Sequence, residues 1–242
     1  MIIAGKTILV TGANRGIGRA LAEEALNRGA KRVHAGTRVP LTHLDPRVTP
    51  LTLDVTSAAQ IQEAARAVSF LDVLINNAGI ADYDDLSDRG ALERHLAVNL
   101  FGTHGVTQAF LPHLIRSRGA IVNNLSTNAL AAFPLIPAYS ISKAAAFSMT
   151  QSQRALLAGR GVRVHAVLTG TVDTDMTRTV DIPKAPPESV ARDIFDAVEK
   201  DEEDIFPGLM SQSLAEGWRD SAAKALEREM AGLAQSISSA RD

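Results

Sequence analysis

Apolar residues follow two alternating patterns along the chain. Short, mostly apolar runs, as at 7–10 and 71–75, are typical of strands buried on both faces, whereas residues 17–28 carry apolar side chains at helical spacing. The same patterns predict further strands at 32–35, 48–53, 120–125 and 162–168, and further helices at 57–68, around 92–114, and at 139–158, 187–200 and 222–234.

This alternation predicts the fold class. Strands followed by helices of this length need crossover connections, so we expect an α/β fold with a doubly wound parallel sheet and helices on both faces, giving three layers. Ligands of such folds bind beyond the carboxyl ends of the strands. The 242 residues show no repeat or linker, so we expect a single domain over 1–242, with 171–187 as a loop that can close over the site.

Composition narrows the function classes. With 45% hydrophobic residues, 21% charged residues and a net charge of −2, the chain can bury a core and has no electrostatic attraction for nucleic acid or an anionic membrane. It has no cysteine, which excludes disulfides, thiolate metal sites and a cysteine nucleophile. No signal peptide or membrane span is recognisable. We therefore expect a cytoplasmic protein that binds no nucleic acid, membrane or metal.

A glycine-rich turn, 11–18, joins the first strand to its helix and has glycines at 12, 16 and 18. The missing side chains let backbone amides approach a pyrophosphate, whose charge meets the positive end of the helix dipole. An isolated motif of this kind can also be only a tight turn. The strand before it and the helix after it favour a dinucleotide site.

The turn resembles that of the short-chain dehydrogenase/reductase family, in its one-domain NADP(H)-dependent branch with a Rossmann-type fold. Asp54 and Val55 resemble the pair that contacts adenine, and 76–79 (NNAG) resembles the family's motif beside the cofactor. After the sixth expected strand, 168–174 resembles the segment that holds the nicotinamide amide, with Thr169 in place of the family's proline. The resemblance covers about residues 5–200. It implies cofactor contacts from Thr11, Gly12, Asn14, Arg15, Gly16, Ile17, Gly18, Thr37, Arg38, Asp54, Val55, Asn77, Ala78, Gly79, Tyr139, Lys143, Gly170, Val172 and Thr174.

The cofactor's phosphate form can be argued from charge. An NAD enzyme of this fold generally has a carboxylate at the end of the second strand, whereas NADP needs a cation there. This chain has Arg38 and no acid at that point, and Arg15 lies within the glycine turn. Both arginines can hold the extra phosphate by charge-assisted hydrogen bonds, although both can also be solvated surface residues. We expect NADP(H).

Catalytic candidates come from one helix and two neighbouring segments. Tyr139 and Lys143 are four residues apart, so they share a helix face. The pKa of tyrosine is about 10, and an adjacent ammonium together with the positive nicotinamide would lower it. By resemblance, Lys143 also holds the ribose hydroxyls, Ser126 at the end of the fifth strand stabilises the developing alkoxide, and Asn99 positions a water between Lys143 and solvent. Taken singly, these residues can be a cap, a buried amide, an interfacial aromatic and a surface charge.

The expected reaction is reduction of a ketone or aldehyde by NADPH, with Tyr139 as proton donor; the same residues serve the reverse oxidation. A non-catalytic NADP(H) sensor is the alternative from another class, and the chain is too short for the sugar-modifying branch. The resemblance also implies a homodimer or homotetramer. A hydrophobic carbonyl substrate is expected from the apolar residues of loop 127–137, which are Leu130, Phe133, Leu135 and Ile136.

Overall fold

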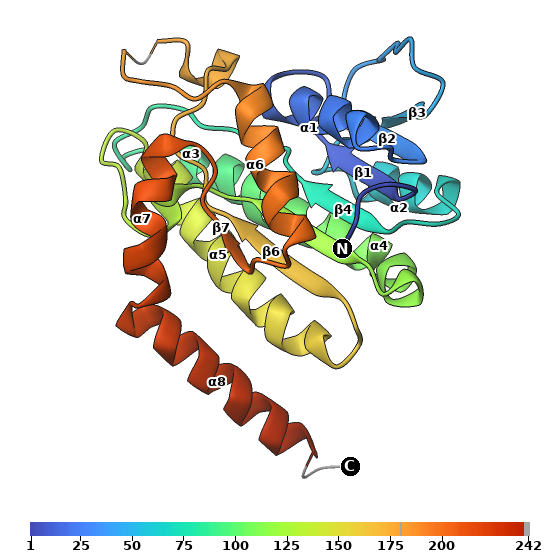
Figure 1. The fold of residues 1–242 in the computed structure, drawn as a ribbon. Coiled ribbons are helices and arrows are strands. Elements are labelled where there is room, and N and C mark those ends of the chain that lie inside the picture. The colour runs from blue at the N-terminus through green and yellow to red at the C-terminus, as the bar shows by residue number, and fades with distance from the viewer. Residues whose placement is uncertain (180, 240–242) are drawn as a thin grey trace.

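A single parallel sheet forms the centre of the protein. The computed structural model describes residues 1–179 and 181–239, with side chains through residue 233. All seven strands are parallel and lie in the order β3-β2-β1-β4-β5-β6-β7 (Figure 1). The strands are β1 (Thr7–Thr11), β2 (Arg32–Thr37), β3 (Val48–Thr52), β4 (Val73–Asn76), β5 (Ala120–Asn124), β6 (Arg163–Val167) and β7 (Asp204–Ile205).

Helices cover both faces of the sheet. On one face α1 and α6 pack on the strands in one apolar cluster, and on the other α2, α4 and α5 contribute to a second. The expected three-layered, doubly wound Rossmann-type fold is therefore confirmed. The helices are α1 (Gly16–Asn27), α2 (Ala58–Ala67), α3 (Arg89–Leu96), α4 (Thr103–Ser117), α5 (Pro137–Ala158), α6 (Pro187–Glu199), α7 (Leu209–Arg219) and α8 (Ala222–Ser239).

The unbroken apolar runs of the central strands follow from burial on both faces. Successive side chains of a strand point to opposite faces, so Leu9 enters one apolar cluster while Ile8 and Val10 enter the other. Every residue of β1 and of β4 is buried. This buried core holds the carboxyl ends of β1, β4 and β5 side by side. The candidate functional residues follow directly after these strand ends.

The helical segment expected around 92–114 is interrupted by a π-helical turn. The structure has α3, then the π turn Ala97–Gly102, then α4. A side chain at Gly102 would come within 2.7 Å of Val55, so this glycine lets the turn approach the loop after β3. Such turns are rare and occur frequently at functional sites. Here the turn carries Asn99, which is buried.

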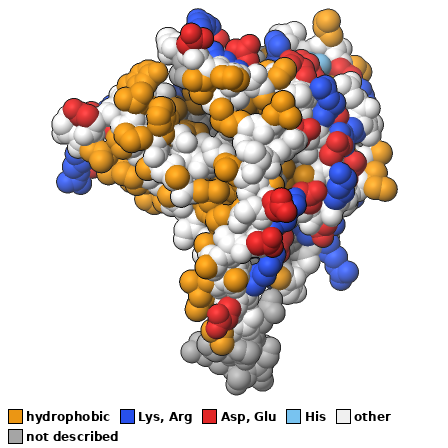
Figure 2. Space-filling model, turned by 60° about the vertical axis from the view of Figure 1, so that its left-hand side comes forward, with side chains coloured by type: hydrophobic (Ala, Val, Ile, Leu, Met, Phe, Trp, Pro, Cys, Tyr) orange, Lys and Arg blue, Asp and Glu red, His pale blue; other side chains and the backbone are white. Residues whose placement is uncertain are grey.

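In the C-terminal region β7 and α7 were not predicted, whereas the helix expected at 222–234 is present as α8 and extends away from the sheet (Figure 1). Its first turn is anchored by Lys224, whose Nζ lies 2.7 Å from Asp204 and 3.0 Å from Glu227. Farther along, Leu226 and Met230 are each 53% exposed, and apolar side chains line this projecting arm (Figure 2). Among the described residues, no helix combines the length and apolarity that a membrane span requires.

Candidate active site

A cleft of about 480 Å³ opens where the strands β1, β2, β4, β5 and β6 end. Every residue expected to contact the cofactor lines it, except Thr11. Thr11 lies beneath the cleft, 1% exposed, where its hydroxyl accepts hydrogen bonds from the backbone N–H groups of Asn77 and Ala78 at 2.9 and 3.0 Å. Thr11 thus joins the glycine turn to the segment after β4.

The glycine turn has no room for side chains. Gly12 and Gly16 have φ angles of +66° and +53°, which favour glycine, and a Cβ at Gly18 would lie 2.1 Å from the Gly12 carbonyl oxygen. No side chain caps α1, so the N–H groups of its first turn face the cleft without a side-chain acceptor. This cradle fits the pyrophosphate of a dinucleotide.

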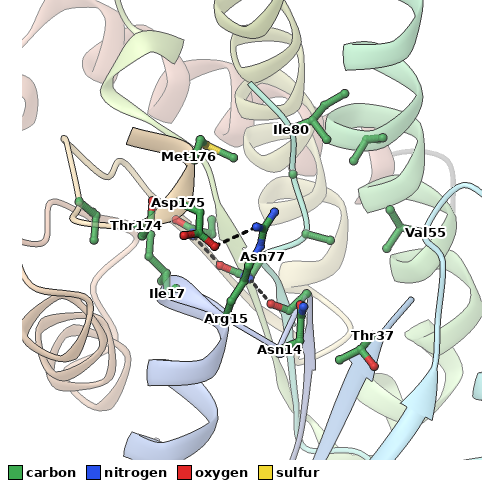
Figure 3. A pocket seen from close by; sticks show the side chains of 18 of the residues that line it. Asn14, Arg15, Ile17, Thr37, Val55, Asn77, Ile80, Thr174, Asp175 and Met176 are labelled. Atoms are coloured by element: carbon green, nitrogen blue, oxygen red, sulfur yellow. Dashed lines mark hydrogen bonds and ion pairs between the residues drawn. The ribbon is translucent and has the colours of Figure 1, made fainter. Parts of the chain in front are cut away.

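Arg15 reaches across the cleft to the loop after β6. Its Nη1 lies 2.9 Å from Asp175 Oδ2 (Figure 3). Asp175 also pairs with Arg178. The two arginines, Arg178 and then Arg15, lower the pKa of the Asp175 carboxyl. Arg38 follows β2 on the rim of the cleft and is exposed. A cation therefore lies at both positions expected to bind the extra phosphate of NADP, Arg15 and Arg38. Arg15 is already paired with the carboxylate of Asp175.

Tyr139 and Lys143 project from the first turns of α5 into the cleft. The Lys143 Nζ lies 5.6 Å from the centroid of the Tyr139 ring and donates to the Asn124 carbonyl oxygen at 2.8 Å. Ser126 follows the end of β5, whose last residue is Asn124. Its hydroxyl accepts the Asn128 N–H at 3.1 Å and hydrogen-bonds the Tyr139 side chain. The phenol, the hydroxyl and the amine therefore gather at one end of the cleft.

The protonation of this group corrects one expectation. Burial raises the pKa of Tyr139, and the hydrogen bond to Ser126 offsets this only in part. Burial also lowers the pKa of Lys143 to about 8. In the absence of cofactor the lysine therefore does not lower the pKa of Tyr139, because the phenol is desolvated and the lysine's Nζ bonds to a carbonyl instead. The expected effect of the positive nicotinamide stays a prediction.

Asn99 lies behind the lysine, 2% exposed. Its side chain donates to the Ile80 carbonyl at 3.0 Å and to the Ser142 hydroxyl at 2.9 Å, and accepts the Ile80 N–H at 3.0 Å. A Cβ at Gly79 would lie 3.2 Å from Asn99 Oδ1 and 3.7 Å from Lys143 Nζ. Both polar groups thus lie close to Gly79, where a side chain would crowd them.

Comparison with known proteins gives the family. The family model for short chain dehydrogenase matches residues 6–184. The chain belongs to the short-chain dehydrogenase/reductase family. It is therefore an oxidoreductase with a site for a nicotinamide cofactor.

Similar proteins include enzymes with different substrates in their names. A 3-oxoacyl-(acyl-carrier-protein) reductase from Thermotoga maritima is 38% identical over 195 residues, which are 73% of this chain and 78% of that protein. A sorbitol dehydrogenase from Cereibacter sphaeroides is 32% identical over 205 residues, 79% and 80% of the two chains. A crystal structure of a short chain dehydrogenase from Burkholderia cenocepacia J2315 in complex with NADP superposes with a TM-score of 0.87 at 38% identity, covering 95% of this chain and 98% of that one.

In this short-chain dehydrogenase the apolar wall expected from loop 127–137 does not line the cleft. Leu130 packs on a separate apolar cluster, while Phe133 and Leu135 are exposed. The direction in which these side chains point is set by tertiary packing, and their apolar character alone does not predict it. The large apolar side chains that do line the cleft come from other segments and include Ile80, Val98, Leu125 and Met176.

The polar lining residues of this short-chain dehydrogenase that were not assigned a role from the sequence include Asn124, Thr169 and Asp175. Thr169 stood out only as a replaced proline, and the other two gave no signal. Thr169 and Asn124 are hydrogen-bonded to each other, and Asp175 pairs with Arg15. These contacts join segments far apart in the chain, so no local pattern could reveal them.

Proposed function

We propose that this enzyme reduces a ketone or aldehyde with NADPH, and that Tyr139 delivers the proton to the carbonyl oxygen. One observation carries the proposal: the Tyr139 phenol, the Ser126 hydroxyl and the Lys143 amine gather at one end of a cleft that a glycine turn shapes for a dinucleotide. A reactant at that end of the cleft would meet a proton donor, a hydrogen-bond donor and a cation together.

NADPH, when bound, supplies the hydride for the carbonyl carbon. The raised pKa of Tyr139 keeps its phenol protonated at neutral pH, which is the form that donates a proton. The Ser126 hydroxyl donates a hydrogen bond to the same oxygen as negative charge develops on it. Lys143 would orient the cofactor ribose, and it lies with Asn99 beside Gly79, from where the two residues would return a proton to the phenol.

The protonation state favours reduction over oxidation at neutral pH. The oxidative direction needs the Tyr139 phenolate, which burial disfavours. The oxidised cofactor carries a positive nicotinamide, and that charge is the remaining source that can lower the pKa of this phenol. Oxidation should therefore require a higher pH than reduction.

NADP(H) rather than NAD(H) is supported by Arg15 and Arg38 on the cleft and by the similar Burkholderia cenocepacia protein, whose structure contains NADP. We propose a hydrophobic carbonyl substrate because large apolar side chains line the cleft. We also propose a cytoplasmic location and a homodimer or homotetramer. Only the self-association is supported by the structure, through exposed apolar residues on the helical layer such as Phe101 at 64% and Leu156 at 73%.

The test is a spectrophotometric screen of NADPH against NADH, with aliphatic aldehydes, aromatic ketones, 3-oxoacyl thioesters and keto sugars as acceptors. We expect consumption of NADPH with at least one apolar carbonyl and, at equal concentration, roughly tenfold or greater preference over NADH. Tight NADPH binding without turnover on any acceptor would contradict the proposal and favour a cofactor sensor.

A further inference from the structure

A line of side-chain hydrogen bonds crosses the carboxyl ends of four neighbouring strands, β6, β5, β4 and β1. The Thr169 hydroxyl, after β6, donates to Asn124 Oδ1 at the end of β5 at 2.8 Å. Asn124 Nδ2 donates to Asn77 Oδ1, after β4, at 3.0 Å. Asn77 Nδ2 in turn donates to the carbonyl oxygens of Thr11 and Gly12 at 2.9 and 3.3 Å. The line thus ties the segment after β6 to the glycine turn after β1.

Each amide in this line has only one workable orientation. Asn77 faces two carbonyl oxygens with its NH2 group, so its own oxygen must accept. Asn124 must then donate from its NH2 group, which leaves its oxygen to accept the Thr169 hydroxyl proton. Reversing any member would set two donors or two acceptors against each other, so the line is rigid as well as continuous.

Asn124 holds the lysine as well. Its backbone carbonyl accepts the Lys143 Nζ at 2.8 Å, while its side chain joins Thr169 and Asn77. Asn124 and Thr169 both line the cleft, and Thr169 is 4% exposed. A single residue therefore contacts three parts of the cofactor site that lie far apart in the sequence.

We propose that Asn124 and Thr169 form a cross-brace, a pair of positioning residues that fixes the segment 169–172 relative to the glycine turn before the cofactor binds. The inference rests on the proposed NADP(H) site. The two ends of a dinucleotide are held by different segments, and ordering the far segment on binding would weaken affinity. When the hydrogen bonds of the cross-brace are present, segment 169–172 is already ordered before the cofactor binds.

The test measures NADPH affinity by fluorescence titration in the wild type and in Thr169→Val, Asn124→Leu and the double variant. Loss of the pre-ordered segment should weaken NADPH binding about 3- to 10-fold in each single variant. The double variant should be no weaker than the weaker single one, because both changes break the same brace. Thr169→Ser, which keeps a hydroxyl, should bind within about twofold of wild type.

Two controls separate positioning from general damage. The family resemblance assigns segment 169–172 to the nicotinamide end of the cofactor, so the affinity for the adenosine bisphosphate half of NADP should be unchanged in Thr169→Val. Thr171→Val removes a hydroxyl from the same loop, one whose contact is a weak approach to Met210 Sδ at 3.9 Å, and should leave NADPH affinity unchanged.

Wild-type-like NADPH affinity in Thr169→Val, or equal weakening toward the adenosine half, would overturn the cross-brace and leave the proposed function standing. Failure of the wild type to bind NADPH or NADH would instead overturn the proposed function, and the cross-brace with it.

Discussion

Lys143 and Lys224 are both buried, but their surroundings predict opposite results when each is replaced by methionine. Lys143 has a single carbonyl partner, and burial lowers its pKa from 10.5 to about 8. Burial acts in the same direction on Lys224, but hydrogen bonding to Asp204 and the charge of that carboxylate reverse the effect, so its pKa is raised. We predict that Lys143→Met stabilises the cofactor-free protein at neutral pH and that Lys224→Met destabilises it.

The magnitude follows from proton linkage. A tenfold change in proton affinity is worth about 1.4 kcal/mol, so lowering the pKa of Lys143 from 10.5 to about 8 corresponds to about 3 kcal/mol. The folded chain loses this proton near pH 8 and the unfolded chain near pH 10.5, so the free energy of unfolding rises with pH between these values. Below pH 8 the penalty is fully present. Methionine removes it but also removes one hydrogen bond, worth about 1 kcal/mol, leaving a net gain of about 2 kcal/mol.

Thermal unfolding, followed by circular dichroism without cofactor, measures both variants. For a chain of this length about 2 kcal/mol corresponds to a rise in Tm of roughly 4–8 °C for Lys143→Met at about pH 7, and this advantage should shrink by about pH 9.5. Lys224→Met should lower Tm, because Asp204 and Glu227 lose a buried cation. A lower Tm for Lys143→Met at neutral pH, or a difference that does not change with pH, would refute the reasoning.

Other substitutions probe the cleft itself. Gly18→Ala places a Cβ 2.1 Å from a backbone oxygen and should lower Tm and abolish NADPH binding, whereas Gly217→Ala, with no neighbour within 4 Å, should leave both intact by the same assays. Arg38→Ser should weaken NADPH about tenfold and leave NADH affinity unchanged in fluorescence titrations; equal losses for both would contradict a phosphate contact. Asp175→Asn frees Arg15 from its internal carboxylate and should tighten NADPH by about fivefold at most, an effect that salt diminishes; weaker binding would argue against competition.

Most of the alternating strands and helices were predictable because each is marked by a local pattern of apolar residues. The first six strands were each found within three residues of their observed ends, since short, mostly apolar runs bounded by turn residues mark strands. β7 has two residues, Asp204 and Ile205, which is too short for any periodicity. The π turn Ala97–Gly102 lies inside an otherwise helical segment. The spacing of apolar residues there is still helical, so it does not reveal the turn.

The residues of the site also fall into two groups: those that a local sequence pattern predicts, and those that only the fold brings together. The glycine turn was predictable because its backbone geometry requires glycine at fixed spacing. The Arg15–Asp175 pair joins residues 160 positions apart, and the Thr169–Asn124 bond joins residues 45 apart, so only the folded sheet brings them together. The protonation of Tyr139 also depended on burial, which motif spacing does not report.

The most direct measurement is turnover in Tyr139→Phe, with NADPH affinity measured on the same preparation. Loss of the phenolic proton should reduce carbonyl-dependent NADPH consumption by about a hundredfold or more, while NADPH binding stays within about twofold of wild type. Retention of most of the wild-type rate would contradict the assignment of Tyr139 as proton donor.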